Sequence, residues 1–137
     1  MRAERIMTEA RIKYLEMLQT SITRMAGNQV QLRTWTVTLG TLVIGYAAAK
    51  EGHPRAALLA ALPAITFWIQ DGYYLSLERN FRELFDRGRQ NESDPPDFFM
   101  LPGRPSAKEW ANCCWRPAAW LAHLPVLVLA IIVGIRR

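Results

Sequence analysis

Residues 117–135 read PAAWLAHLPVLVLAIIVGI, which is 19 residues without a formal charge, and Arg116, Arg136 and Arg137 border them. A segment that crosses the hydrocarbon core of a bilayer needs about 20 largely apolar residues. This stretch, the third window, therefore predicts a membrane-spanning helix.

Two shorter uncharged stretches precede it, the first window at 34–49 and the second window at 56–70. The second extends to Leu77 if Asp71 is tolerated inside it. Aromatic residues gather near the ends of the windows, where membrane interfaces are expected; they are Trp35, Trp68, Tyr73, Tyr74, Trp110, Trp115 and Trp120. A small soluble helical globule is the alternative, but the windows are apolar all round rather than on one stripe. We predict an all-α integral membrane protein with three transmembrane helices.

The distribution of Lys and Arg predicts how the chain is oriented. Six precede the first window and seven lie between the second and third windows, against four in 50–55 and 136–137. Because positive charge is enriched on the cytoplasmic side, we expect an inner-membrane protein with the N-terminus and the central segment in the cytoplasm and with residues 50–55 and the C-terminus outside. If the third window is re-entrant, the C-terminus also lies inside. Membrane topology and contact with anionic lipid account for most of the basic balance.

The windows divide the chain into four predicted parts. Residues 1–28 form a cytoplasmic amphipathic helix that ends at Gly27 and Asn28, and 29–77 form a transmembrane hairpin. Residues 78–116 hold a cytoplasmic extension of the second helix, a Pro-rich loop and a short interfacial helix, and 117–137 form the third transmembrane helix.

Two apolar stripes are expected to bury each other, within one subunit or between subunits. The first follows helical spacing through Tyr14, Leu18 and Ile22. The second continues from Tyr74 to Phe85 in a helix predicted from Arg55 to near Gly88. Ser106 and Glu109 have the spacing of a capping box at the start of the interfacial helix.

The first window has one small, partly hydroxylated face, made by Thr34, Thr38, Thr41 and Gly45. Small residues let transmembrane helices pack closely, and in a homo-oligomer the same face lines a water-filled pore. Both interpretations stay open, and they are compatible with each other.

The second window carries an alanine face that leads to Asp71 and, opposite it, a face predicted to contact lipid. An acid at the membrane boundary is costly unless it faces protein, water or a cation. Asp71 either lies at a pore mouth, where it favours cations, or pairs with a nearby cation such as Arg33.

Few other residues suggest chemistry. His123 in the third window is either hydrogen-bonded to a neighbour or a gate, and Cys113 and Cys114 are adjacent, which suits neither a disulfide nor a zinc site. Because no nucleophile, base and orienting group can be assembled, we expect neither an enzyme nor a cofactor or metal site.

Arginines in the cytoplasmic part form the candidate ligand site. In a symmetric oligomer they would repeat around an axis and bind an anion at several points. Alternatively, they pair with acids at helical spacing. The set is Arg24, Arg33, Arg79, Arg82, Arg87 and Arg89.

Much of residues 14–100 resembles a group of small bacterial multi-pass membrane effectors of antiphage defence systems. These include nucleotidyltransferase-partnered (Hailong-type) and cyclic-oligonucleotide signalling systems. Gln29, Val30 and Gly72 depart from the group's pattern. The residues that carry the resemblance are Arg24, Met25, Ala26, Asn28, Trp35, Thr36, Val37, Thr38, Phe67, Trp68, Asp71, Tyr73, Tyr74, Leu75, Glu78, Arg79, Phe81, Arg82, Leu84, Asp97, Phe98 and Met100.

The resemblance implies an oligomeric ion channel or membrane-disrupting effector that causes growth arrest or cell death on infection. Its implied ligand is a nucleotide or oligonucleotide made by a partner nucleotidyltransferase. The alternative function is a non-conducting membrane adaptor whose cytoplasmic helices recruit a partner.

Overall fold

A computed structural model of the chain describes residues 2–49, 52–90 and 101–135, and these are helical throughout with short connections and no strand. The elements are α1 (Arg2–Ala48), the 3₁₀-helix η1 (Pro54–Ala60), α2 (Ala61–Gln90), α3 (Ala107–Cys114) and α4 (Pro117–Ile135). The predicted all-α class is confirmed. Lys50, most of the predicted Pro-rich loop with Asp97, Phe98 and Met100, and Arg136 and Arg137 lie outside the described residues.

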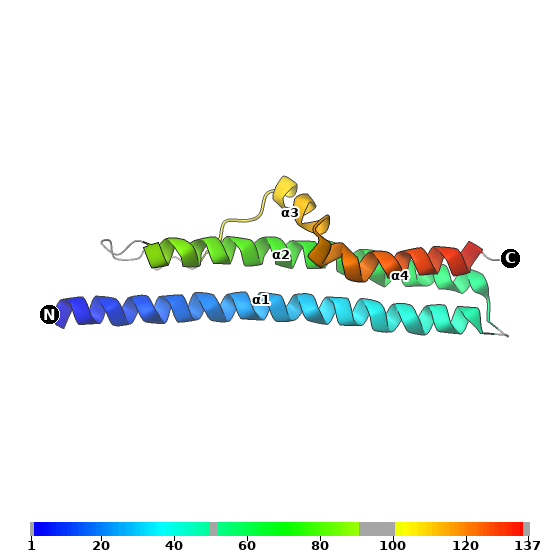
Figure 1. Cartoon of the computed structure of the whole chain (residues 1–137), viewed down its shortest axis with the longest axis horizontal. Helices are drawn as coiled ribbons and strands as arrows, with labels where there is room; N and C mark the ends of the chain where they lie inside the picture. The colour runs from blue at the N-terminus through cyan, green and yellow to red at the C-terminus, as the bar shows by residue number, and fades with distance from the viewer. Residues whose placement is uncertain (1, 50–51, 91–100, 136–137) are drawn as a thin grey trace.

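α1 is a single helix of 47 residues, about 70 Å long at 1.5 Å per residue. η1 and α2 return along it, and α4 lies beside them near the C-terminal end of α1, as Figure 1 shows. The chain therefore has a two-helix stalk (8–28 of α1 with 77–90 of α2) and a three-helix end (29–48, 54–76 and 117–135). All three uncharged windows lie in the three-helix end.

The predicted end of the first helix at Gly27 and Asn28 is wrong, because α1 continues through both residues. A glycine costs a helix only about 1 kcal/mol relative to alanine. Packing on α2 offsets that cost on both sides of Gly27, through Ile22 in the stalk and through Gln29, which is buried and bonded to Glu78.

The helix predicted to begin at Arg55 begins at Pro54, with a 3₁₀ segment that the sequence did not indicate. Pro54 suits the first turn of a helix, where its missing N–H has no intrahelical acceptor. Ala57 and Ala60, both fully buried, lie three residues apart, which places them on one face at three residues per turn. α2 then ends at Gln90, two residues beyond the predicted Gly88.

The two apolar stripes do bury each other within one chain. Tyr14, Leu18 and Ile22 of α1 pack with Phe81 of α2 in the core of the stalk. The predicted faces of the second window also hold, because Ala57 and Ala64 are buried whereas Leu62 and Ile69 are exposed.

Among the described helices, α4 alone is long and apolar enough to cross a membrane, with a mean hydropathy of 2.4. Only 28% of its apolar window is buried within the chain, whereas the core helix of a soluble protein is mostly covered. Such an exposed, apolar helix indicates association with a membrane.

Candidate functional site

Arg33 of α1 and Asp71 of α2 form an ion pair where the stalk meets the three-helix end. Arg33 Nε lies 2.8 Å from Asp71 Oδ2, and Nη2 donates to Oδ1 at 3.1 Å. The Asp71 side chain is fully buried, and that of Arg33 is 27% exposed. This two-point geometry matches the planar guanidinium to both carboxylate oxygens.

α4 brings a histidine to the same carboxylate. Nε2 of His123 lies 3.3 Å from Asp71 Oδ2, and Nδ1 lies 2.8 Å from the Thr36 hydroxyl of α1. Both His123 and Thr36 are fully buried. The site thus takes one polar residue or more from each of the three long helices.

The polar contacts continue from this point toward the stalk. Arg33 Nη2 donates to Gln29 Oε1 at 3.1 Å, and Gln29 Nε2 donates to Glu78 Oε2 at 2.5 Å. Glu78 also accepts from Arg82 at 2.6 Å. We call the connected set, Gln29, Arg33, Thr36, Asp71, Glu78, Arg82 and His123, the polar network.

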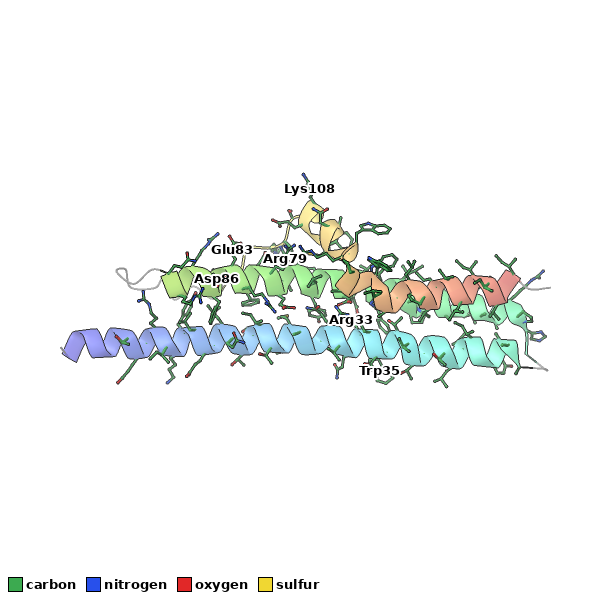
Figure 2. The ribbon with its side chains drawn as sticks, viewed as in Figure 1. Arg33, Trp35, Arg79, Glu83, Asp86 and Lys108 are labelled. Atoms are coloured by element: carbon green, nitrogen blue, oxygen red, sulfur yellow. The ribbon has the colours of Figure 1, made fainter. Side chains whose placement is uncertain are left out.

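In Figure 2, Arg33 projects from α1 toward α2 and α4, whereas Trp35 projects from the opposite side. The difference follows from the helix, because residues two apart lie on different faces. Gln29, Arg33 and Thr36 are four and three residues apart and therefore share the inner face of α1.

The predicted pore-lining residues fall into two groups that the structure does not bring together. Thr34, Thr38, Thr41 and Gly45 are exposed along the outer face of α1, whereas Asp71 is inside the bundle and contacts Arg33. Of the two interpretations of Asp71 that the sequence left open, the ion pair with Arg33 is the one found.

Most of the candidate arginines contact acids of their own chain. Arg82 pairs with Glu78, Arg87 with Glu83, and Arg89 approaches Asp86 at 3.9 Å. These pairs have the helical spacing that was the alternative to ligand binding. Arg79 points toward α3 in Figure 2, with Nη1 at 3.8 Å from Cys113 Sγ, and Arg24 is exposed on α1.

α3 is held against α2 by two tryptophans. Trp68 Nε1 donates to the Cys114 carbonyl at 2.7 Å, and Trp110 Nε1 donates to the Ile69 carbonyl at 3.2 Å. Trp115 stacks edge-on against Trp68 and is 72% exposed. An indole ring that contacts solvent on one side and apolar groups on the other suits a membrane interface.

The predicted capping box of α3 is confirmed. The Ser106 hydroxyl accepts from Glu109 N–H, and the Glu109 carboxylate accepts from Ser106 N–H. Hydrogen bonding of the Glu109 carboxylate to the Ser106 backbone N–H, and secondarily to the Ser106 side chain, lowers the pKa of Glu109. Two open cavities of about 270 and 330 Å³ lie beside Glu109, between α2 and the start of α3, and Asn80 and Glu83 line both.

The cysteines lie close to the network. Burial raises the pKa of the Cys114 thiol, and the neighbouring Cys113 and Asp71 raise it further. In the part of the chain that the structure describes, no group of three or more His, Cys, Asp or Glu side chains is arranged to hold a metal ion.

Sequence reasoning missed Thr36 and Gln29 as members of the site. Their signal was present, because polar residues recur at helical spacing on the inner face of a helix whose apolar window begins at residue 34.

Comparison with protein-family models, curated proteins and solved structures found no match to this chain.

Proposed function

We propose that the protein is a three-span membrane protein that assembles as a homo-oligomer and conducts ions. The support for three spans is the surface of the three-helix end, where large apolar side chains are exposed on every helix. Examples are Leu42 and Tyr46, Leu59 and Leu62, and Leu129 and Ile132. In water such a surface would be an aggregation hazard, whereas in a bilayer it faces lipid.

The Arg33–Asp71 ion pair supports a membrane-spanning role for the shorter windows, whose uncharged stretches are too short by sequence alone to cross a bilayer. Charged residues inside a membrane are tolerated when they pair and face protein. With the Arg33 charge neutralised inside the bundle, the apolar surface of α1 continues past it to Val30, which is 61% exposed. Residues 30–49 then reach the length of about 20 that a span requires.

The observation that carries the oligomer is the exposed face of Thr34, Thr38, Thr41 and Gly45 on α1. The Thr34 hydroxyl donates to the Val30 carbonyl at 2.9 Å, so it needs no water and suits a helix contact in lipid. Three helices in one chain enclose no conducting path because their shared interior is filled. A path along this face therefore requires several copies.

Cross-linking in the membrane tests the assembly. In a background with Cys113→Ser and Cys114→Ser, we expect Thr38→Cys to form disulfide-linked dimers. In the proposed oligomer, this face of α1 packs against the same face of neighbouring copies around the symmetry axis. Leu62→Cys, on an exposed face of α2, is the matched control and should stay monomeric. A monomer in nanodiscs by native mass spectrometry would exclude the channel.

The antiphage role and the nucleotide signal rest on the sequence resemblance. With Arg82 and Arg87 paired to acids, a ligand would have to compete for them, so Arg24 and Arg79 are the arginines to replace first. We expect Arg79→Gln to weaken nucleotide binding in a titration with purified protein. Binding that survives replacement of Arg24, Arg79 and Arg82 together would place the ligand elsewhere.

The non-conducting adaptor is the second candidate, favoured by the stalk, whose charged outer surface is suited to a soluble partner. Ion flux into liposomes separates the two. Leakage in any nucleotide condition supports the channel, whereas sealed liposomes in all of them support the adaptor.

A further inference from the structure

The Thr36 hydroxyl has two acceptors within reach and one hydrogen to donate. Its oxygen lies 2.9 Å from the Leu32 carbonyl and 2.8 Å from His123 Nδ1. A hydroxyl donates once and accepts twice, and a histidine nitrogen donates or accepts according to its protonation. The proton count on His123 therefore decides which way the hydroxyl points.

Two arrangements satisfy every group in this corner. With neutral His123, the hydroxyl donates to Nδ1 and Nε2–H donates to Asp71. With doubly protonated His123, Nδ1–H donates to the Thr36 oxygen, the hydroxyl donates to the Leu32 carbonyl, and Nε2–H still donates to Asp71. Uptake of a proton at Nδ1 leaves no buried polar group unpaired, so the site avoids the penalty of an unsatisfied donor or acceptor.

We propose that His123 is a proton-binding site that regulates the assembly; the regulatory part rests on the proposed membrane function. Arg33 and His123 both contact the same Asp71 oxygen, Oδ2, at 2.8 and 3.3 Å. Protonation gives this carboxylate a second cationic partner. The α1–α2 pair weakens while the α2–α4 contact strengthens, so proton binding shifts how α4 is held on the hairpin.

The groups around His123 make this site a sensor rather than a proton conduit. His123 faces Arg33 and Thr36 from α1 and Asp71 from α2. From α3, the titratable Cys114 thiol packs against Gly72. Glu78 connects to Arg33 only through Gln29. On the other side of Thr36, the inner face of α1 continues with Gly40 and Ala47, which offer no side-chain group to pass a proton onward.

Histidine nitrogen NMR reads the site without any need for conduction. The sample is the full chain with ¹⁵N-labelled histidine in nanodiscs, and His53→Gln removes the other histidine signal. At the alkaline end of a pH series we expect an unprotonated Nδ1 and a protonated Nε2, and at its acidic end we expect both nitrogens to be protonated. A neutral ring with its hydrogen on Nδ1, or no change over this range, would overturn the proposal.

Thr36 supplies the matched variants. Thr36→Val removes the partner of Nδ1 in both arrangements, and because the hydrogen bond from the charged ring is the stronger of the two, the midpoint of the His123 titration should move to lower pH. Thr36→Ser keeps the hydroxyl and should leave the midpoint in place. Equal midpoints in all three proteins would show that the hydroxyl does not respond to the proton.

Flux measurements then separate this proposal from the proposed function. Liposome flux that changes with pH in the parent protein but not in His123→Gln supports regulation by this site. Flux with the same pH response in both proteins overturns regulation while leaving the channel intact. Sealed liposomes together with the expected NMR titration would refute the channel and leave the proton site standing.

Discussion

Arg33 Nε and Asp71 Oδ2 lie 2.8 Å apart across the α1–α2 interface, although the two residues are 38 positions apart in the chain. The carboxylate is fully buried and also contacts His123 of α4. One acid thus connects the three helices of the membrane-associated end, and the stability of their packing is expected to depend on it.

Asp71→Asn should destabilise the three-helix end by about 3 kcal/mol, because it leaves Arg33 without its charge partner in a largely buried site. Thermal unfolding in detergent, followed by circular dichroism, measures the effect. Glu83→Gln breaks an exposed pair on α2 and should cost less than about 0.5 kcal/mol. Unchanged ion selectivity with lowered stability would assign Asp71 a purely structural role.

Gly40→Ala should separate α1 from α4. A Cβ atom at position 40 would overlap the Val126 side chain, and overpacking of this kind costs about 2 kcal/mol. Gly27→Ala is the matched control because, apart from the adjacent residues and backbone of α1 itself, no atom lies within 4 Å of its added Cβ, and it should stabilise α1 by about 0.5–1 kcal/mol. Equal melting temperatures for the two variants would contradict the close packing of α1 and α4.

Leu18→Ala should open the stalk while leaving the three-helix end folded. Leu18 is fully buried between α1 and α2, and truncating such a side chain costs about 3 kcal/mol. Faster hydrogen exchange confined to residues 8–28 and 77–90 is the expected result. Ile12→Ala, at an exposed position of the same helix, should leave exchange unchanged.

Cys114 should react slowly with maleimide at neutral pH. Its pKa is raised above the ordinary value of 9.0, so the reactive thiolate fraction is smaller than that of a free cysteine, and labelling should accelerate as the pH rises above that value. The reference is Thr23→Cys, at an exposed position, in a background with Cys113→Ser and Cys114→Ser. Equal labelling rates for the two thiols at pH 7 would contradict the burial of Cys114. Cys113→Ser isolates Cys114 for this measurement.

Ser106→Ala should fray the start of α3 by removing half of the capping box, a loss of about 1 kcal/mol. Acid should act in the same direction. The pKa of Glu109 is lowered from 4.5 by its bonds to Ser106, so its stabilising effect is complete above that value and is lost as the pH falls through the lower folded-state value. Amide exchange at Trp110 reports both effects, and Lys108→Ala, which leaves the cap intact, is the control.

Several features could be predicted from the sequence because they depend on composition and period. The stripe through Leu18, the exposed side of the second window and the Ser106–Glu109 cap are local patterns, and each was found where it was expected. The break at Gly27 was mispredicted because the same local rules omit tertiary contacts, which carried α1 through the glycine.

By itself, the sequence determined that this chain is helical, where its apolar segments lie and that α4 is apolar enough to cross a membrane. Only the tertiary structure decided which partners Asp71 and His123 take. His123 meets Asp71 across 52 positions and Thr36 across 87, and such distant pairs depend on the register in which three helices pack. Helical period fixes the face on which a residue lies, but the depth at which helices align decides which polar groups meet.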